Sequence, residues 1–107
     1  MIEPLILRED AAQAAALFAR TTGGETVYRP LSEDDFYDTF IKSTDTITKI
    51  NLCEKENDVV IGFASGCINS GKAVGYITMI VVDRAHRRDG IGTKLLAALE
   101  AELHKAA

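Results

Sequence analysis

Apolar and polar positions follow two different periods along the chain, and together these periods predict its elements. Short apolar or alternating runs predict strands at 5–7, 46–54, 59–68 and 74–82. Apolar residues at helical spacing predict helices at 11–20, from Ser32 to about Lys42, and from Ile91 to His104. The expected order is strand, helix, helix, three antiparallel strands joined by short turns, and a last helix.

Polar residues at the ends of these runs indicate where the helices begin. Asp10, with Gln13 three residues later, predicts an N-cap and its capping partner for the first helix. Ser32 predicts the cap of the second helix, and Glu33-Asp34-Asp35 places negative charge at its positive end. The strand Val74–Val82 is apolar on both faces, which is typical of a central strand covered on both sides.

The composition indicates one small soluble domain over residues 1–107. A formal net charge of −4 argues against a general nucleic-acid-binding protein. No apolar run is long enough to span a bilayer, and no signal peptide opens the chain. Cys53 and Cys67 form no C-x-x-C pair and no metal pattern with His86 and His104, so we expect two free thiols in a reducing cytoplasm and no metal site.

The loop between the strand Val74–Val82 and the last helix carries the chemistry that the sequence suggests. It reads Arg87-Arg88-Asp89-Gly90-Ile91-Gly92 and leads into the first helical turn. The first turn of a helix offers unpaired N–H groups and a partial positive charge, so phosphate binds there readily. Gly90 and Gly92 allow a pyrophosphate to approach the backbone, and the two arginines and the Thr93 hydroxyl add donors.

Two other interpretations of this loop compete with a pyrophosphate site. A tight strand-to-helix turn with solvated arginines would produce the same residues without a ligand. A different phosphate or nucleotide binder could use the same helix N-terminus, although the Rossmann spacing G-x-G-x-x-G and the P-loop Gly-Lys-Ser/Thr are absent.

The segment from Ile80 to Leu96 resembles the GNAT superfamily of N-acetyltransferases. The signature of that family is Arg/Gln-x-x-Gly-x-Gly/Ala after a strand that ends in Val-Asp, and here Val82-Asp83 precedes Arg87–Gly92. The resemblance implies an α/β chain of the α+β type. Its mixed, mainly antiparallel sheet of about four strands has two helices on one face and the pyrophosphate-binding helix on the other.

The resemblance also implies a site for acetyl-CoA as the acyl donor. The backbone N–H groups of Arg88, Gly90, Gly92 and Thr93 would bind its pyrophosphate. The main chain of Ile80 and Val82 would bind the pantetheine arm, and an N–H near Ile80 would polarise the thioester. The predicted cofactor-binding set is Ile80, Val81, Val82, Arg87, Arg88, Asp89, Gly90, Ile91, Gly92 and Thr93.

Two departures from the family pattern limit the prediction of catalysis. Many family members place a glutamate base at the position of Thr78, which cannot serve, so the sequence names no catalytic residue. The chain also ends in helical composition, where the family continues with further strands and a helix. We therefore expect only the N-terminal half of the fold, either as a fragment or completed by a partner chain, with Val74–Val82 as an edge that favours a homodimer or other strand pairing.

The predicted function is transfer of an acetyl group from acetyl-CoA to a primary amine on a small molecule or peptide. The alternative is a non-catalytic acyl-CoA-binding or assembly module that needs a partner chain. The acidic residues Glu33-Asp34-Asp35 could attract a cationic acceptor, but helix capping explains them more simply. Tyr76 could present its hydroxyl to the acceptor, but a half-buried core tyrosine is the simpler interpretation.

Overall fold

The computed structural model describes residues 2–5, 8–22, 33–69, 71 and 74–106 of the chain. The described elements follow the predicted order. They are β1 (Ile2–Pro4), α1 (Arg8–Thr22), α2 (Glu33–Phe36), the π-helix η1 (Tyr37–Ile41), β2 (Ile47–Glu56), β3 (Val59–Asn69), β4 (Val74–Val82), the 3-10 helix η2 (Arg84–Asp89) and α3 (Ile91–Ala106).

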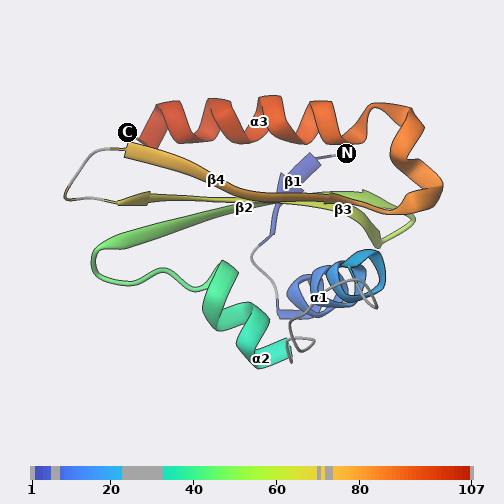
Figure 1. Cartoon of the computed structure of the whole chain (residues 1–107), viewed down its shortest axis with the longest axis horizontal. Coiled ribbons are helices and arrows are strands. Elements are labelled where there is room, and N and C mark those ends of the chain that lie inside the picture. The colour runs from blue at the N-terminus through green and yellow to red at the C-terminus, as the bar shows by residue number, and fades with distance from the viewer. Residues whose placement is uncertain (1, 6–7, 23–32, 70, 72–73, 107) are drawn as a thin grey trace.

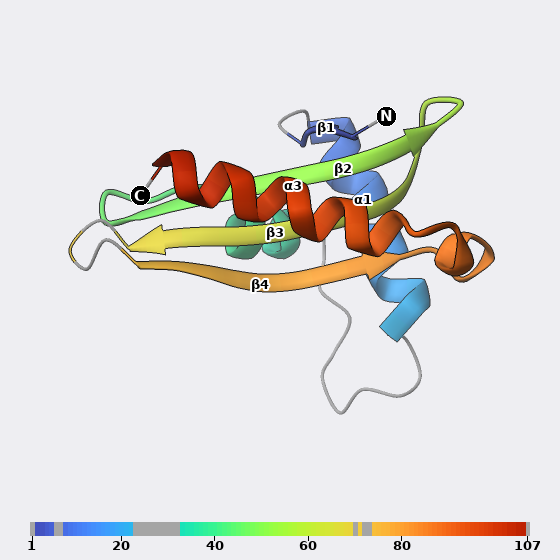
Figure 2. The same cartoon turned by 90° about the horizontal axis from the view of Figure 1, so that it is seen from above.

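The four strands form one sheet in the order β1-β2-β3-β4, and each pair of neighbours is antiparallel. Figure 1 shows α3 on one face of this sheet and α1 and α2 on the other. Seen from above in Figure 2, α3 runs over β3, in the middle of the sheet's long strands. The predicted α+β arrangement with helices on both faces is confirmed, although the described sheet is entirely antiparallel rather than mixed.

Each face of the sheet buries its own apolar core. The core under α1 and α2 consists of Leu5, Ala11, Ala14, Ala15, Leu17, Phe36, Cys53, Val60 and Phe63. The core under α3 consists of Leu52, Ile61, Ala64, Ile68, Ile91, Leu95, Leu99 and Leu103. β2 and β3 both contribute to the two cores, and β3 is buried almost without interruption, so its nearly continuous apolar sequence follows from being covered on both faces.

Glycines in the sheet let α3 pack closely on it. A Cβ at Gly62 would lie 3.1 Å from Leu95 Cδ1, and a Cβ at Gly66 would lie 2.9 Å from the Tyr76 carbonyl oxygen and 3.3 Å from Leu99 Cδ1. These contacts leave no room for a side chain. The leucines that recur every four residues in α3 therefore sit over positions that the sequence leaves empty.

The first strand lies earlier in the chain than predicted. β1 spans Ile2–Pro4, where it pairs with Leu52–Glu54 of β2. Leu5 follows the strand, is 1% exposed, and donates its N–H to the Asn51 carbonyl at 2.8 Å. The predicted strand residues Ile6 and Leu7 lie outside the described residues. The prediction is wrong for Leu5, because the pairing partner, rather than the local apolar run, decides where a short edge strand forms.

The capping interpretation of Asp10 and Gln13 is also wrong. α1 begins at Arg8, and Asp10 instead lies 2.9 Å from the ammonium of Lys55, which lies 2.9 Å from Glu3 as well. These hydrogen bonds, the one to Asp10 above all, raise the pKa of Lys55. The Gln13 amide accepts from the Val60 N–H at 2.8 Å and donates to the Asp58 carbonyl at 3.3 Å. Both side chains therefore tie α1 to the sheet.

The second helix ends as a wide π-turn rather than continuing as an α-helix to Lys42. The Lys42 N–H donates to the Tyr37 carbonyl at 2.9 Å, which is the i→i+5 spacing of a π-helix. Lys49 Nζ and Asn51 Nδ2 then donate to the carbonyls of Thr39 and Phe40, each at 2.9 Å. These bonds from β2 hold the widened turn against the sheet. The predicted cap, Ser32, lies outside the described residues.

β4 spans Val74–Val82 as predicted, but it is the outer strand of the described sheet. The expectation that it is covered on both faces is wrong for its first half, where Val74 is 43% exposed and Ile77 43%. Tyr76 is 50% exposed and belongs to neither core, so the interpretation as a core tyrosine is wrong. The second half, Met79–Val82, packs into the two cores.

Candidate acyl-donor site

The turn after β4 is built around Asp83. Its N–H donates to the Ile61 carbonyl at 2.8 Å, and its carboxylate accepts the Ala85 N–H at 3.0 Å. Its carbonyl accepts the His86 N–H at 2.9 Å. Asp83 therefore caps η2, and its carboxylate is used within the turn instead of facing a ligand.

Gly90 joins η2 to α3 in a left-handed conformation. Its φ of 74° and ψ of 15° favour glycine, because a Cβ would be strained there. The Lys94 N–H donates to the Gly90 carbonyl at 3.1 Å, which is the first α-helical bond of α3. The N–H groups of Ile91, Gly92 and Thr93 precede that bond and lie at the open end of the helix, where an anion is stabilised.

No described protein atom fills the space beside the two glycines of this first turn. A Cβ at Gly92 would meet only Val82 Cγ2, at an ordinary contact distance of 3.6 Å, and a Cβ at Gly90 would meet nothing within 4 Å. Gly92 thus differs from Gly62 and Gly66, where neighbouring atoms occupy the space that a side chain would need. A glycine that no neighbour requires, at a helix N-terminus, fits a backbone approached by a phosphate.

The outer edge of β4 runs toward this helix end. The Asp83 N–H points to β3, and the backbone groups of successive residues in an antiparallel strand point alternately to either side. The N–H and carbonyl of Val81 therefore also point to β3, whereas those of Ile80 and Val82 point outward, away from the sheet. The Arg87 side chain confirms this direction for Val82, since its Nε donates to the Val82 carbonyl at 3.3 Å. The side chains of Ile80 and Val82 pack into the core under α3, and that of Val81 packs under α1.

A β-bulge interrupts β4 at Thr78. Ser65 pairs with Met79 and Gly66 pairs with Ile77, so Thr78 has no partner residue in β3. A bulge shifts the alternation of a strand and re-aims its backbone. Thr78 is exposed, and it lies at the position where the resemblance places a glutamate base. No alternating pattern in the sequence signalled this bulge, because it comes from the register of two strands.

The charged residues of the loop lie at the surface. Arg84, Arg87, Asp89, Thr93 and Lys94 are exposed, while the side chain of Arg88 is outside the described part of the structure. Arg87 is turned toward the β4 edge by its bond to Val82. Within the described part of the segment 84–94, the exposed cations Arg84, Arg87 and Lys94 outnumber the exposed acid Asp89, so this segment carries a net positive charge.

A contact between His86 and Glu56, which the sequence did not predict, links the loop to β2. His86 Nε2 lies 3.1 Å from Glu56 Oε2, and the two residues come from η2 and from the end of β2. The imidazole side chain is 24% exposed and that of Glu56 57%. A histidine within the signature loop was the available signal, but its partner is 30 positions earlier in the chain and only the fold brings them together.

Among the acidic residues after Ser32, Asp34 has a structural partner. Asp34 lies 3.2 Å from Arg8, whose guanidinium also stacks 4.2 Å from the centre of the Tyr37 ring. This exposed pair joins α1 to α2. The structure therefore gives Asp34 a role in joining the two helices, which neither the acceptor interpretation nor the capping interpretation of the acidic cluster predicted.

The described thiols and carboxylates do not form a second reactive centre. Burial, followed by the nearby Glu3 and Asp10, raises the pKa of Cys53 to about 11, so this free cysteine remains a protonated thiol at neutral pH. Within the described residues, no group of three His, Cys, Asp or Glu is placed to hold a metal ion. Among the described helices, none is long and apolar enough to cross a bilayer.

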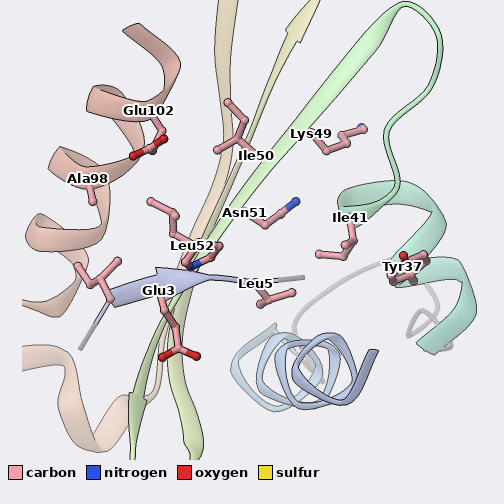
Figure 3. A pocket seen from close by; sticks show the side chains of 12 residues that line it. Glu3, Leu5, Tyr37, Ile41, Lys49, Ile50, Asn51, Leu52, Ala98 and Glu102 are labelled. Carbon is pink, nitrogen blue, oxygen red and sulfur yellow. The ribbon is translucent and has the colours of Figure 1, made fainter. Parts of the chain in front are cut away.

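Two hollows in the structure lie away from the loop. One, of about 690 Å³, lies where the short strand β1 ends beside β2, between η1 and α3, and Figure 3 shows Tyr37, Asn51 and Glu102 on its walls. The other, of about 580 Å³, lies beside Val74–Ile77 and the end of α3. Neither of these two hollows is lined by residues of the predicted site.

Known structures share this fold over almost the whole chain. A tandem GNAT protein from the clavulanic acid biosynthesis pathway matches 99% of this chain with a TM-score of 0.84 and 18% identity. An aminoglycoside 6'-N-acetyltransferase complexed with coenzyme A matches 98% with a TM-score of 0.79 and 20% identity. An N-acetyltransferase from Staphylococcus aureus matches 100% with a TM-score of 0.76 and 20% identity.

The chain spans only part of these proteins: 33% of the tandem protein, 56% of the aminoglycoside enzyme and 67% of the staphylococcal enzyme. No curated protein sequence matches it. The family model of the acetyltransferase (GNAT) family matches residues 11–106, which include both helical layers, β2–β4 and the signature loop. The chain therefore belongs to the GNAT acetyltransferase family.

Proposed function

We propose that this chain binds acetyl-CoA at the N-terminus of α3 and along the outer edge of β4, and takes part in acetyl transfer to a primary amine. The observation that carries the proposal is the pair Gly90 and Gly92. The positive φ of Gly90 favours glycine at that position. The space beside Gly92 is open, at a helix N-terminus next to cationic residues. The outward backbone of Ile80 and Val82 continues from this point as a hydrogen-bonding edge for an extended, amide-containing arm.

The roles of the remaining site residues follow from where they lie. The N–H groups of Ile91, Gly92 and Thr93 would bind the pyrophosphate, with Arg87, Arg88 and the Thr93 hydroxyl as further donors. Asp89 lies just before Gly90 and contributes through its backbone. Val81 would contribute indirectly, because its backbone pairs with Phe63 in β3 and so holds Ile80 and Val82 turned outward.

In acetyl transfer the neutral amine nitrogen bonds to the thioester carbonyl carbon, the C–S bond breaks, and the thiolate takes up a proton. Thr78 cannot remove a proton from an ammonium group, and Asp83 is occupied by the Ala85 N–H. The chain therefore offers no carboxylate base on β4. We propose that acceptors react as amines that are already neutral, or through a water-relayed proton.

Release of free thiol from acetyl-CoA, measured over a panel of amines, tests this proposal. If the chain supplies no base, kcat/KM should rise about tenfold per pH unit until the acceptor's own pKa is reached. Acceptors of low pKa should then react fastest at neutral pH. A plateau well below the acceptor's pKa would show that a base on the protein had been overlooked.

The second candidate function is a binding or assembly module, and the bulged, exposed Thr78 favours it. A chain of this kind would bind acetyl-CoA but release no thiol with any amine, at any pH. Activity that appears only after a further segment or partner chain is added would support this alternative. The two candidates share the acyl-donor site and differ only in turnover.

We further propose that the first half of β4 pairs with another strand, as in a homodimer. Val74, Tyr76 and Ile77 are exposed apolar residues on an outer strand, and such edges pair with other chains. Light scattering at high protein concentration should show a dimer or larger species, and Ile77→Lys should shift it toward monomer. Val59→Lys, at a residue that is 50% exposed but on β3, is the matched control. A clean monomer of the unchanged chain would contradict pairing through β4.

A further inference from the structure

Two contacts attach the acyl-donor loop to the hairpin between β2 and β3. The first is the backbone bond from Asp83 to Ile61, at 2.8 Å. The second is the contact of His86 Nε2 with Glu56 Oε2, at 3.1 Å. η2 lies between the end of β4 and Gly90, so these contacts act on the segment that delivers the chain to the first turn of α3.

The hairpin is a firm support for this attachment. Asn57 and Asp58 form its turn with φ of 53° and 64°, the two positive values that a tight hairpin turn requires. The carbonyl of Asp58 is also bonded by the Gln13 amide of α1. Just beyond the turn, Lys55 pairs with Val60 and Glu54 with Gly62, so Ile61 is an extra, bulged residue, and its carbonyl receives the Asp83 N–H. Glu56 thus lies in a hairpin that is hydrogen-bonded both to α1 and to the loop.

η2 itself has few other anchors. It is a six-residue 3-10 helix in which Arg84, Ala85, Arg87 and Asp89 are exposed. His86 is the inward residue of this helix, and its Nδ1 is buried with no hydrogen-bond partner among the described residues. Among the described residues, the largely covered imidazole of His86, held by the Glu56 carboxylate, and the Arg87 bond to Val82 are therefore the side-chain links between η2 and the sheet.

We propose that Glu56 and His86 are positioning residues of the acyl-donor site. By holding η2 against the hairpin, the pair fixes the direction in which the N–H groups of Ile91, Gly92 and Thr93 point. This inference rests on the proposed function and adds to it a carboxylate from a distant strand, one that touches neither the helix N-terminus nor the β4 edge. Loss of the pair would cost donor affinity because the N–H groups would have to be ordered when the donor binds.

Calorimetric titration of acetyl-CoA into Glu56→Gln, His86→Gln and the double variant tests the pair. A partly exposed hydrogen bond to a carboxylate contributes modestly, so each single variant should weaken binding by about two- to fivefold. The double variant should bind no more weakly than either single one, since both remove the same contact. Asp58→Asn is the matched control: it removes one negative charge from the same turn, keeps a residue that tolerates positive φ, and should leave the affinity unchanged.

Amide hydrogen exchange in the unliganded proteins gives a second readout that general destabilisation would not reproduce. Glu56→Gln should speed exchange at residues 84–93 while exchange in β3 and the melting temperature stay as in the unchanged chain. Equal affinities and equal exchange in Glu56→Gln and Asp58→Asn would overturn the positioning role and leave the proposed function standing. Failure of the unchanged chain to bind acetyl-CoA would overturn the proposed function and this inference with it.

Discussion

Gly92→Val should weaken acetyl-CoA binding by about tenfold to a hundredfold, the equivalent of one charge-assisted hydrogen bond lost at about 1.5–3 kcal/mol. Valine would add its two methyl groups beside the first turn of α3. The Cβ itself fits, because the nearest atom, Val82 Cγ2, would be 3.6 Å away. The fold should therefore survive, while the methyl groups occupy the space through which a phosphate reaches the N–H groups of Ile91, Gly92 and Thr93.

Ala97→Val is the control for this substitution, because Ala97 is an exposed residue later in the same helix. It places the same β-branched side chain on α3 at a distance from the site, and should leave affinity unaltered. Competition with a fluorescent CoA derivative would give the dissociation constants, and thermal melts would show that both variants are folded. Equal affinity of Gly92→Val and the unchanged chain would mean that the donor does not approach this turn.

Phe36→Ala should lower the free energy of unfolding by about 3–5 kcal/mol, the usual cost of removing a fully buried aromatic ring. Phe36 is 0% exposed, and its ring centre lies 5.1 Å from that of Phe40, 5.6 Å from that of Phe63 and 6.0 Å from that of Phe18. α2 has only four residues and cannot be stable alone, so this cluster, together with the bonds from Lys49 and Asn51 to η1, attaches it to the sheet.

Urea unfolding followed by circular dichroism would measure the loss. Phe36→Leu, which keeps most of the apolar volume, should cost clearly less. Val59→Ala, at a side chain that is 50% exposed, should change stability by less than about 0.5 kcal/mol. A loss below about 1 kcal/mol for Phe36→Ala would show that the aromatic cluster is not a main support of the fold.

The elements that the sequence predicted best are those whose pattern comes from their own core-facing residues. β4 has the predicted bounds, and α3 begins at Ile91 as predicted, because Leu95, Leu99 and Leu103 recur at helical spacing over one buried face. The errors lie where a distant partner decides. Asp10 has the local signature of a cap, but Lys55, from a strand far along the chain, determines its role.

The candidate site divides in the same way. The glycines and arginines of the loop are contiguous, so a single segment predicted the phosphate-binding turn. The bulge at Thr78, the bulge at Ile61 and the contact of His86 with Glu56 all depend on the registers of β2, β3 and β4. Strand register is a long-range property that alternation in one strand does not fix, which is why these features came only from the structure.

The exposed first half of β4 shows a third limit. An apolar strand has the same sequence whether its partner is in the same chain, in another chain or absent, so its apolar pattern predicted a covered central strand. Only the expected absence of the rest of the family's fold predicted Val74–Val82 as an edge. The structure places Val74–Val82 at the outer edge of the described sheet.

The most direct test of the central claim is calorimetric titration of acetyl-CoA into the purified chain. The account predicts a single site with a micromolar dissociation constant, weakened by salt because the loop cations Arg84, Arg87 and Lys94 attract the phosphates. Acetyl-pantetheine, which lacks the pyrophosphate, should bind far more weakly. Absence of binding, or equal binding of the two compounds, would contradict a donor site built on the N-terminus of α3.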